Sequence, residues 1–116
     1  MSSPQNGTIF SGEHVTITVS LVDGDSVALD GAAVDAIASY QYIIATSPYA
    51  ATNLISKTIG AGVTLSNTAF TATVVLDDTD TDDLDGIYYH EAKSTGDDGA
   101  EYTSMSGKLV AIKRVL

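Results

Sequence analysis

The segment from His14 to Leu21 alternates polar and apolar side chains without interruption. Successive side chains of a β-strand point to opposite faces, so the odd-numbered residues here share one face and the even-numbered residues share the other. Every odd-numbered residue is apolar, which predicts a strand with one side in a core and the other in water. The apolar face consists of Val15, Ile17, Val19 and Leu21.

Further short segments rich in Val, Ile, Thr and Tyr follow at intervals of about 8–12 residues, separated by Gly- and Asp-containing turns. The alanines of residues 32–45 could support a helix, but the aromatic and β-branched residues after Ser39 favour a strand over about 36–45. Further strands are expected over 54–59, 69–76, 87–94, 101–105 and from 109 onward. This spacing predicts an all-β fold, an antiparallel β-sandwich of about seven or eight short strands. Its core should include Val15, Ile17, Val19, Phe70, Val74, Ile87 or Tyr88, and Ile112.

The 116 residues suit one domain, which we divide into an extended arm (1–9), the sandwich (10–113) and a tail (114–116). Because the chain has no cysteine, disulfides, thiolate nucleophiles and cysteine-based zinc sites are excluded. The net charge of −10 repels phosphate backbones and anionic lipids, so neither nucleic acid nor a membrane is expected as a partner. No apolar run approaches the 18 residues or so of a membrane span, and the first residues do not resemble a signal peptide.

Six of the fifteen acidic residues lie within Asp77–Asp85. Alternating carboxylates on a loop are typical of calcium sites. An EF-hand loop that began at Asp78 would need Gly at its sixth position and Glu at its twelfth, where this chain has Asp83 and Tyr89. A calcium site of another design stays open, with Asp78, Asp80 and Asp82 as its candidate ligands.

The preferred interpretation of the acidic segment is a solvated connection between two strands. It is long enough for one helical turn, with Asp78 or Thr79 as the N-cap and Leu84 as the single contact with the core. On this interpretation the protein has no metal site and no cofactor.

The two histidines, His14 and His90, both fall in predicted strand segments. A histidine base needs a nucleophile or a substrate within reach, and no Gly-x-Ser-x-Gly elbow is present. We therefore interpret both as surface or cross-strand packing residues and do not expect an enzyme. The six tyrosines outnumber the two phenylalanines, which suits contact surfaces as well as sandwich edges and leaves carbohydrate binding open.

Both ends of the sandwich are candidate docking edges, because an edge strand exposes unpaired backbone N–H and C=O groups. The N-terminal arm carries an apolar pair, and the last strand carries basic residues on an acidic molecule, which suits an acidic neighbour. The residues expected to contact neighbouring subunits are Ile9, Phe10, Lys113 and Arg114.

The order of these motifs resembles that of small immunoglobulin-like β-sandwich proteins in the virions of tailed bacteriophages. These include head- and connector-associated proteins and the N-terminal domain of baseplate upper proteins. The resemblance covers roughly residues 10–113, and Gly86–Glu91 is its most distinctive part. Its other elements are Ser11-Gly12-Glu13, Asp30–Val34, Gly62–Leu65 before Phe70–Val74, and Gly99–Gly107 before the final strand.

The resemblance implies an immunoglobulin-like fold and a non-enzymatic structural role. The expected function is a capsid decoration or cement protein, or a head–tail connector (neck) subunit. A tail or baseplate adaptor and a carbohydrate-binding module for host attachment are the alternatives. The implied partners are other virion proteins, with this chain as a homo-oligomer or symmetric array. The implied location is the virion, assembled in the host cytoplasm, where disulfides are rare.

Overall fold

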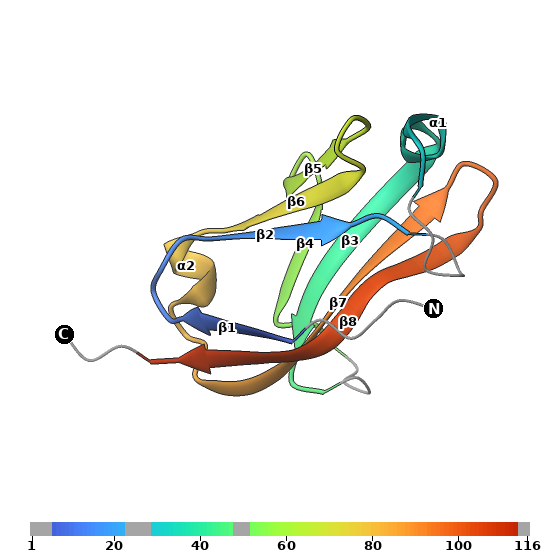
Figure 1. The fold of residues 1–116 in the computed structure, drawn as a ribbon. Helices are drawn as coiled ribbons and strands as arrows, with labels where there is room; N and C mark the ends of the chain where they lie inside the picture. Colours follow the sequence, from blue (N-terminus) through green and yellow to red (C-terminus); the bar gives the residue numbers. More distant parts are fainter. Residues whose placement is uncertain (1–5, 23–28, 48–51, 114–116) are drawn as a thin grey trace.

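The computed structural model describes residues 6–22, 29–47 and 52–113 (Figure 1). The expected tail, with Arg114, and the first five residues of the arm lie outside this part. Two short helices and eight strands make up the described chain. They are β1 (Gly7–Phe10), β2 (Val15–Ser20), α1 (Gly31–Asp35), β3 (Ile37–Ala45), β4 (Ile55–Ile59), β5 (Gly62–Ser66), β6 (Thr71–Leu76), α2 (Asp78–Thr81), β7 (Gly86–Gly96) and β8 (Glu101–Ile112).

The strands form two layers that face one another (Figure 1). The order along the sheet is β1-β8-β7-β3-β4-β5-β6-β2. One layer contains β8, β7 and β3, and the other contains β5, β6 and β2, which correspond to the G-F-C and D-E-B groupings of an immunoglobulin sandwich. The prediction of an all-β sandwich with seven or eight strands is therefore confirmed.

The pairing differs from the predicted antiparallel pattern at two places. β4 and β5 pair in parallel where the chain crosses between the layers, so the two layers are one continuous sheet. Gly60 and Gly62 allow this crossing, since both have φ in the left-handed region, +80° and +105°. β1 also pairs in parallel with β8, and Gly7 lies opposite Leu109.

The core lies between the layers and is made by alternate residues of the strands. Val19 and Leu21 of the first alternating segment are fully buried, while Val15 and Ile17 are partly buried and pack against the core. Val74 is buried as predicted. The largest fully buried side chains are Tyr40, Tyr42, Leu21, Ile44, Leu76, Met105 and Leu109.

Two residues that we expected in the core, Phe70 and Ile112, are exposed, and of the expected pair Ile87 or Tyr88 it is Tyr88 that packs against the core. Phe70, 38% exposed, lies in the turn before β6 with φ of +58°, so the alternation of β6 does not extend to it. Ile87 and Ile112 are 67% and 44% exposed. They alternate with Tyr88 and Ala111, whose side chains face the core instead.

The ambiguous segment after Asp30 contains both of the structures that it could support. α1 occupies Gly31–Asp35, and the carboxylate of Asp30 caps it by accepting a 2.8 Å hydrogen bond from Ala33 N–H. β3 then begins at Ile37, close to the predicted residue 36.

Two expectations about the C-terminal half differ from the structure. The segments 101–105 and 109 onward are one strand, β8, whose register against β7 shifts between Ala92 and Lys93. The N-cap of α2 is Asp77 rather than Asp78 or Thr79. Within the described residues no helix is long and apolar enough to cross a membrane.

Candidate functional site

An apolar surface lies where β1 and β8 end side by side, and we call it the terminal patch. Phe10 and Ile112 are the last residues of their strands and lie opposite each other in the β1–β8 register. Ile87 of β7 lies opposite Val110 of β8. Side chains on this face alternate with the buried residues Ile9, Leu109 and Ala111, so they point out of the core. The patch consists of Phe10, Ile87, Val110 and Ile112.

The exposure of the terminal patch is the property that makes it a candidate site. Ile87 is 67% exposed, and Phe10 and Ile112 are each 44% exposed. Scattered single apolar residues are normal on a protein surface, whereas a group of neighbouring exposed apolar residues is a candidate interaction site. β1 adds to this, because it is the last strand of the sheet order and pairs with β8 alone.

Two lysines lie beside the terminal patch. Lys108 of β8 lies opposite Tyr89 of β7, and Lys113 directly follows Ile112. Both lysines are exposed. Within the described part of the chain, neither ammonium group forms an ion pair, whereas Lys57 and Lys93 each contact a carboxylate. A protein with a net charge of −10 thus has its unpaired described lysines next to its exposed apolar side chains.

The structure places the predicted docking residues in different environments. Phe10 and Lys113 lie at the surface, at the terminal patch. Ile9 is only 6% exposed and packs into the chain's own core, because β1 is a strand of the sheet from Gly7 onward and not a free arm. Arg114 lies outside the described residues.

The candidate calcium ligands are not brought together around one point. Asp80 Oδ2 lies 2.8 Å from the ammonium nitrogen of Lys57 and accepts a 2.8 Å hydrogen bond from Asp77 N–H. Asp78 and Asp82 are exposed at the two ends of the helical turn. No group of three or more His, Asp or Glu among the described residues is arranged to hold a metal ion.

The Lys57–Asp80 pair joins β4 to α2, so the acidic segment is not wholly solvated as predicted. Both side chains are largely buried, at 17% and 22% exposure. Burial alone would raise the pKa of Asp80, but the hydrogen bonds from Lys57 and Asp77 and the charge of Lys57 together lower it. Leu84 is buried as predicted, but it is not the single buried residue of this segment, because Thr81 is also fully buried.

The two histidines have different surroundings. The His14 ring is exposed, with Nδ1 3.8 Å from the carboxylate of Asp77. His90 is 4% exposed, and its Nδ1 lies 2.9 Å from the hydroxyl of Tyr42 in the middle of the core. The expectation of a surface residue and a cross-strand packing residue is therefore confirmed. The sequence pattern contained no sign that His90 would meet Tyr42.

Tyr88 closes the corner between β6 and β7. Its hydroxyl accepts a 2.9 Å hydrogen bond from Asp85 N–H and donates to the Asp85 carbonyl. Immunoglobulin sandwiches have a tyrosine in this place, two residues before the core cysteine of strand F. Here the residue two positions later is His90, which contacts Tyr42 of the adjacent strand β3.

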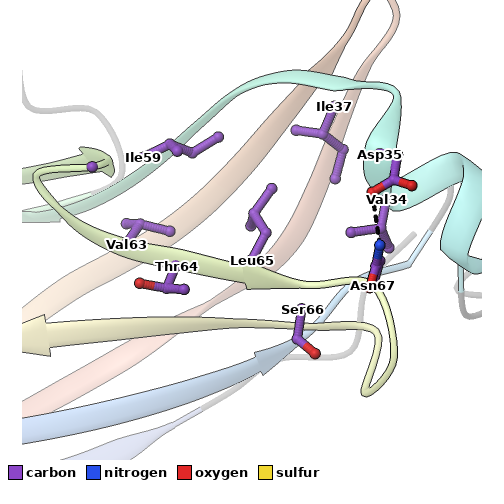
Figure 2. A pocket seen from close by; sticks show the side chains of 10 residues that line it. Val34, Asp35, Ile37, Ile59, Val63, Thr64, Leu65, Ser66 and Asn67 are labelled. Atoms are coloured by element: carbon purple, nitrogen blue, oxygen red, sulfur yellow. Dashed lines mark hydrogen bonds between the residues drawn. The ribbon is translucent and has the colours of Figure 1, made fainter.

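A second candidate surface, which is concave, lies at the other end of the sandwich, and we call it the α1 hollow (Figure 2). It is an open hollow of about 710 Å³ between α1, the start of β3, and the β4–β5 crossing. Ile37 and Leu65 point toward one another across it (Figure 2). At one side Asn67 donates a 3.0 Å hydrogen bond to the carboxylate of Asp35. The lining residues are Val34, Asp35, Ile37, Ile59, Gly60, Val63, Thr64, Leu65, Ser66 and Asn67.

A third, polar hollow of about 500 Å³ lies over β3, β4 and β7. The ion pair of Lys93 with Glu101, 3.4 Å apart, lies at its side. Tyr40 is the one aromatic residue among those that line it, and only 1% of Tyr40 is exposed. A sugar ring stacks on an exposed aromatic face, so this hollow offers no stacking platform.

No protein-family model matches this chain, and no curated protein matches it. Among solved structures it is similar to the 2,6-sialyltransferase of Vibrionaceae Photobacterium sp. JT-ISH-224, solved with CMP and lactose. The match has 10% sequence identity and a TM-score of 0.40, and it covers 97% of this chain. This chain spans only 18% of that structure, and a likeness of this degree carries no functional argument.

Proposed function

We propose that this protein is a non-enzymatic structural subunit of a tailed-phage particle, a capsid decoration protein or a head–tail connector subunit. The observation that carries the proposal is the terminal patch, where Phe10, Ile87 and Ile112 are exposed on neighbouring strands. A surface of this kind is stabilised when a neighbouring protein covers it. The motif order described above points to phage virions as the setting.

The shape of the sandwich supports the same role. The patch lies at one end of a molecule that extends 46 Å along its longest axis, so a subunit attached there would project its remaining surface outward (Figure 1). The net charge of −10 keeps such a projecting domain apart from other acidic surfaces.

Mass spectrometry and cryo-electron microscopy of purified particles test the proposal. We expect the chain in fixed copy number at symmetric positions, with the terminal patch against a neighbouring protein. Its absence from purified particles would refute the structural role. Density at the tail or baseplate would move the subunit to the adaptor alternative, and binding of the isolated domain on a glycan array would favour host attachment.

Substitutions in the patch link its exposure to incorporation. Ile87→Thr combined with Ile112→Thr keeps β-branched residues in both strands and removes apolar surface, so the domain should fold and enter particles poorly. Leu54→Thr is the matched control, because Leu54 is 52% exposed and lies outside the patch. Equal incorporation of the double variant and the control would show that the subunit attaches through another surface.

A further inference from the structure

The core of the sandwich contains one side chain that can gain a charge near neutral pH. Among the buried residues that the structure describes, only His90 is of a type that ordinarily changes charge between about pH 5 and pH 8. We propose that His90 is an acid-sensitive switch, and that protonation of its ring unlocks the sandwich. The inference concerns how this chain holds its fold, and it does not depend on the proposed function.

The contact between His90 and Tyr42 requires the neutral form of the imidazole. Burial, and to a smaller extent the neighbouring Tyr40, raise the pKa of Tyr42, so its hydroxyl keeps its proton and can donate it to Nδ1 of His90, 2.9 Å away. A neutral imidazole has one nitrogen that accepts, whereas both nitrogens of the charged ring are donors. Protonation at Nδ1 would therefore remove the acceptor from the Tyr42 hydroxyl inside the core.

The strands around His90 offer no carboxylate that could balance a charge on the ring. Its cross-strand neighbours are Ile44 of β3 and Gly107 of β8. Glu91 follows His90 in the chain, but it alternates onto the outer face of β7, where it accepts a 3.0 Å hydrogen bond from the Tyr89 hydroxyl. The core-facing residues of the opposing strands β2 and β6 are apolar, namely Val15, Ile17, Val19, Ala72, Val74 and Leu76.

The remaining ionisable groups on the core side are tyrosines and one ion pair. Lys57 of β4 lies opposite Tyr42, so the two share a face, and its ammonium group is 2.8 Å from the carboxylate of Asp80 in α2. The other carboxylates of the acidic segment are exposed. A charged His90 would thus share this face with a cation whose counter-ion is already engaged. The tyrosines on this side, which bear no charge at neutral or acid pH, are Tyr40, Tyr42, Tyr88 and Tyr102.

Acid should therefore destabilise the fold, because the unfolded chain accepts the proton more readily. An unfolded histidine titrates near pH 6.5, whereas the folded core would have to hold an unbalanced charge away from water. Below about pH 6.5 the unfolded state then binds one proton more than the folded state. The equilibrium constant for folding should fall by up to about tenfold per pH unit, and by roughly 25-fold between pH 7 and pH 5.

The position of β7 makes this response a property of the whole sandwich. β7 lies between β3 and β8 in the sheet order and pairs with both along most of its length. The ring of His90 cannot reach water through the movement of an edge strand alone. Opening at His90 also separates the strands that carry Ile87 and Ile112, so the terminal patch is lost together with the fold.

Urea titrations at about pH 7, 6 and 5, above the range in which ordinary carboxylates titrate, test the switch. The wild-type chain should show the roughly 25-fold loss. His90→Asn has an amide oxygen that can accept from Tyr42 but does not titrate, so its loss over this range should be less than about threefold, whatever its stability at neutral pH. His14→Gln removes the exposed histidine and is the matched control, which should respond to acid as the wild type does.

Two further measurements keep the test decisive if His90→Asn does not fold. The double variant Tyr42→Phe/His90→Phe removes both partners of the buried contact, which costs less than removing one, and it should also lose the acid response. In wild-type protein, the ring resonances of His90 should remain those of a neutral imidazole for as long as the chain stays folded. An unchanged acid response in the His90 variants, or a His90 ring that takes up a proton while the sandwich remains folded, would overturn the switch.

Discussion

The hydroxyl oxygen of Tyr42 lies 2.9 Å from Nδ1 of His90, and the two rings meet edge to face at 87°. Both residues are buried, on the adjacent strands β3 and β7. A polar contact in this position stabilises the fold only while both partners are present, because a buried polar atom that loses its partner retains the cost of its desolvation.

Tyr42→Phe should therefore lower the free energy of unfolding by about 1–3 kcal/mol, although it removes only one oxygen atom. Tyr102→Phe is the control, since Tyr102 is only partly buried, and it should change stability by less than about 0.5 kcal/mol. Urea titrations of both variants measure the difference. Equal stability of the two variants would mean that the Tyr42 hydroxyl makes no net contribution.

Stability should fall at alkaline pH because of two buried tyrosines. Burial raises the pKa of Tyr40 to about 12, and burial with the neighbouring Tyr40 raises that of Tyr42 as well. In the unfolded chain both titrate near 10.0. Below that pH the folded and unfolded states bind the same protons at these sites. Above it the unfolded state loses protons first, so stability declines by up to about 1.4 kcal/mol per pH unit for each tyrosine.

Denaturant titrations at about pH 9 and about pH 11 measure this decline. Tyr40→Phe provides the internal test, because stability of the variant should depend less steeply on pH. A slope unchanged by the substitution would assign the alkaline transition to other groups.

Because Asp80 pairs with Lys57, its carboxylate should be the one in the acidic segment whose removal lowers the stability of the fold. Asp80→Asn should destabilise by about 1 kcal/mol, the upper range for a pair that is not deeply buried. The control Asp83→Asn, at an exposed position, should be neutral or slightly stabilising because it relieves repulsion. A double-mutant cycle with Lys57→Met isolates the pair. Since the folded-state pKa of Asp80 is lowered, its contribution should be present above its ordinary pKa of 3.8 and lost as the pH falls below it.

At position 70 glycine should give a more stable protein than alanine, which is the reverse of the usual order of these two residues. With φ of +58° Phe70 is in the left-handed region, which costs an L-residue roughly 1–2 kcal/mol and glycine almost nothing. Phe70→Gly should therefore be more stable than Phe70→Ala by about 1 kcal/mol, as measured by thermal unfolding. Both variants lack the ring, so the comparison isolates the backbone. An alanine variant that is as stable or more stable would show that the turn relaxes to another conformation.

Most of the fold could be predicted because strand alternation is a local property. The alternation of residues 14–21 separates the apolar face of β2 from its polar face, and the glycine and aspartate turns mark where strands end. Phe70 shows the limit of this reasoning. An aromatic residue before an alternating segment is ordinarily read as part of the strand, and its left-handed backbone goes against its residue type.

Only part of the candidate site could be predicted from the sequence, because the site depends on contacts between distant segments. The amphipathic end of the chain indicated Phe10 and Lys113, but the register that pairs Phe10 with Ile112 is not written in either segment alone. The same is true of the α1 hollow, whose lining comes from two separate stretches of the chain, residues 34–37 and 59–67. Ile9 was misassigned for this reason, because an apolar pair does not reveal which member faces the core.

The parallel pairing of β1 with β8 has a consequence for how the protein is made. Gly7 lies opposite Leu109, so β1 has no β8 partner until all the strands between them in the sequence have been synthesised. Closing so long a loop costs conformational entropy, and this cost arises before the β1–β8 hydrogen bonds can stabilise the fold. During synthesis β1 therefore has no β8 partner while the strand pairs that follow it in the sequence form. The surface built from Phe10 and Ile112 forms only when β8 joins β1, so a nascent chain has no such surface to offer a neighbour before the sandwich is assembled.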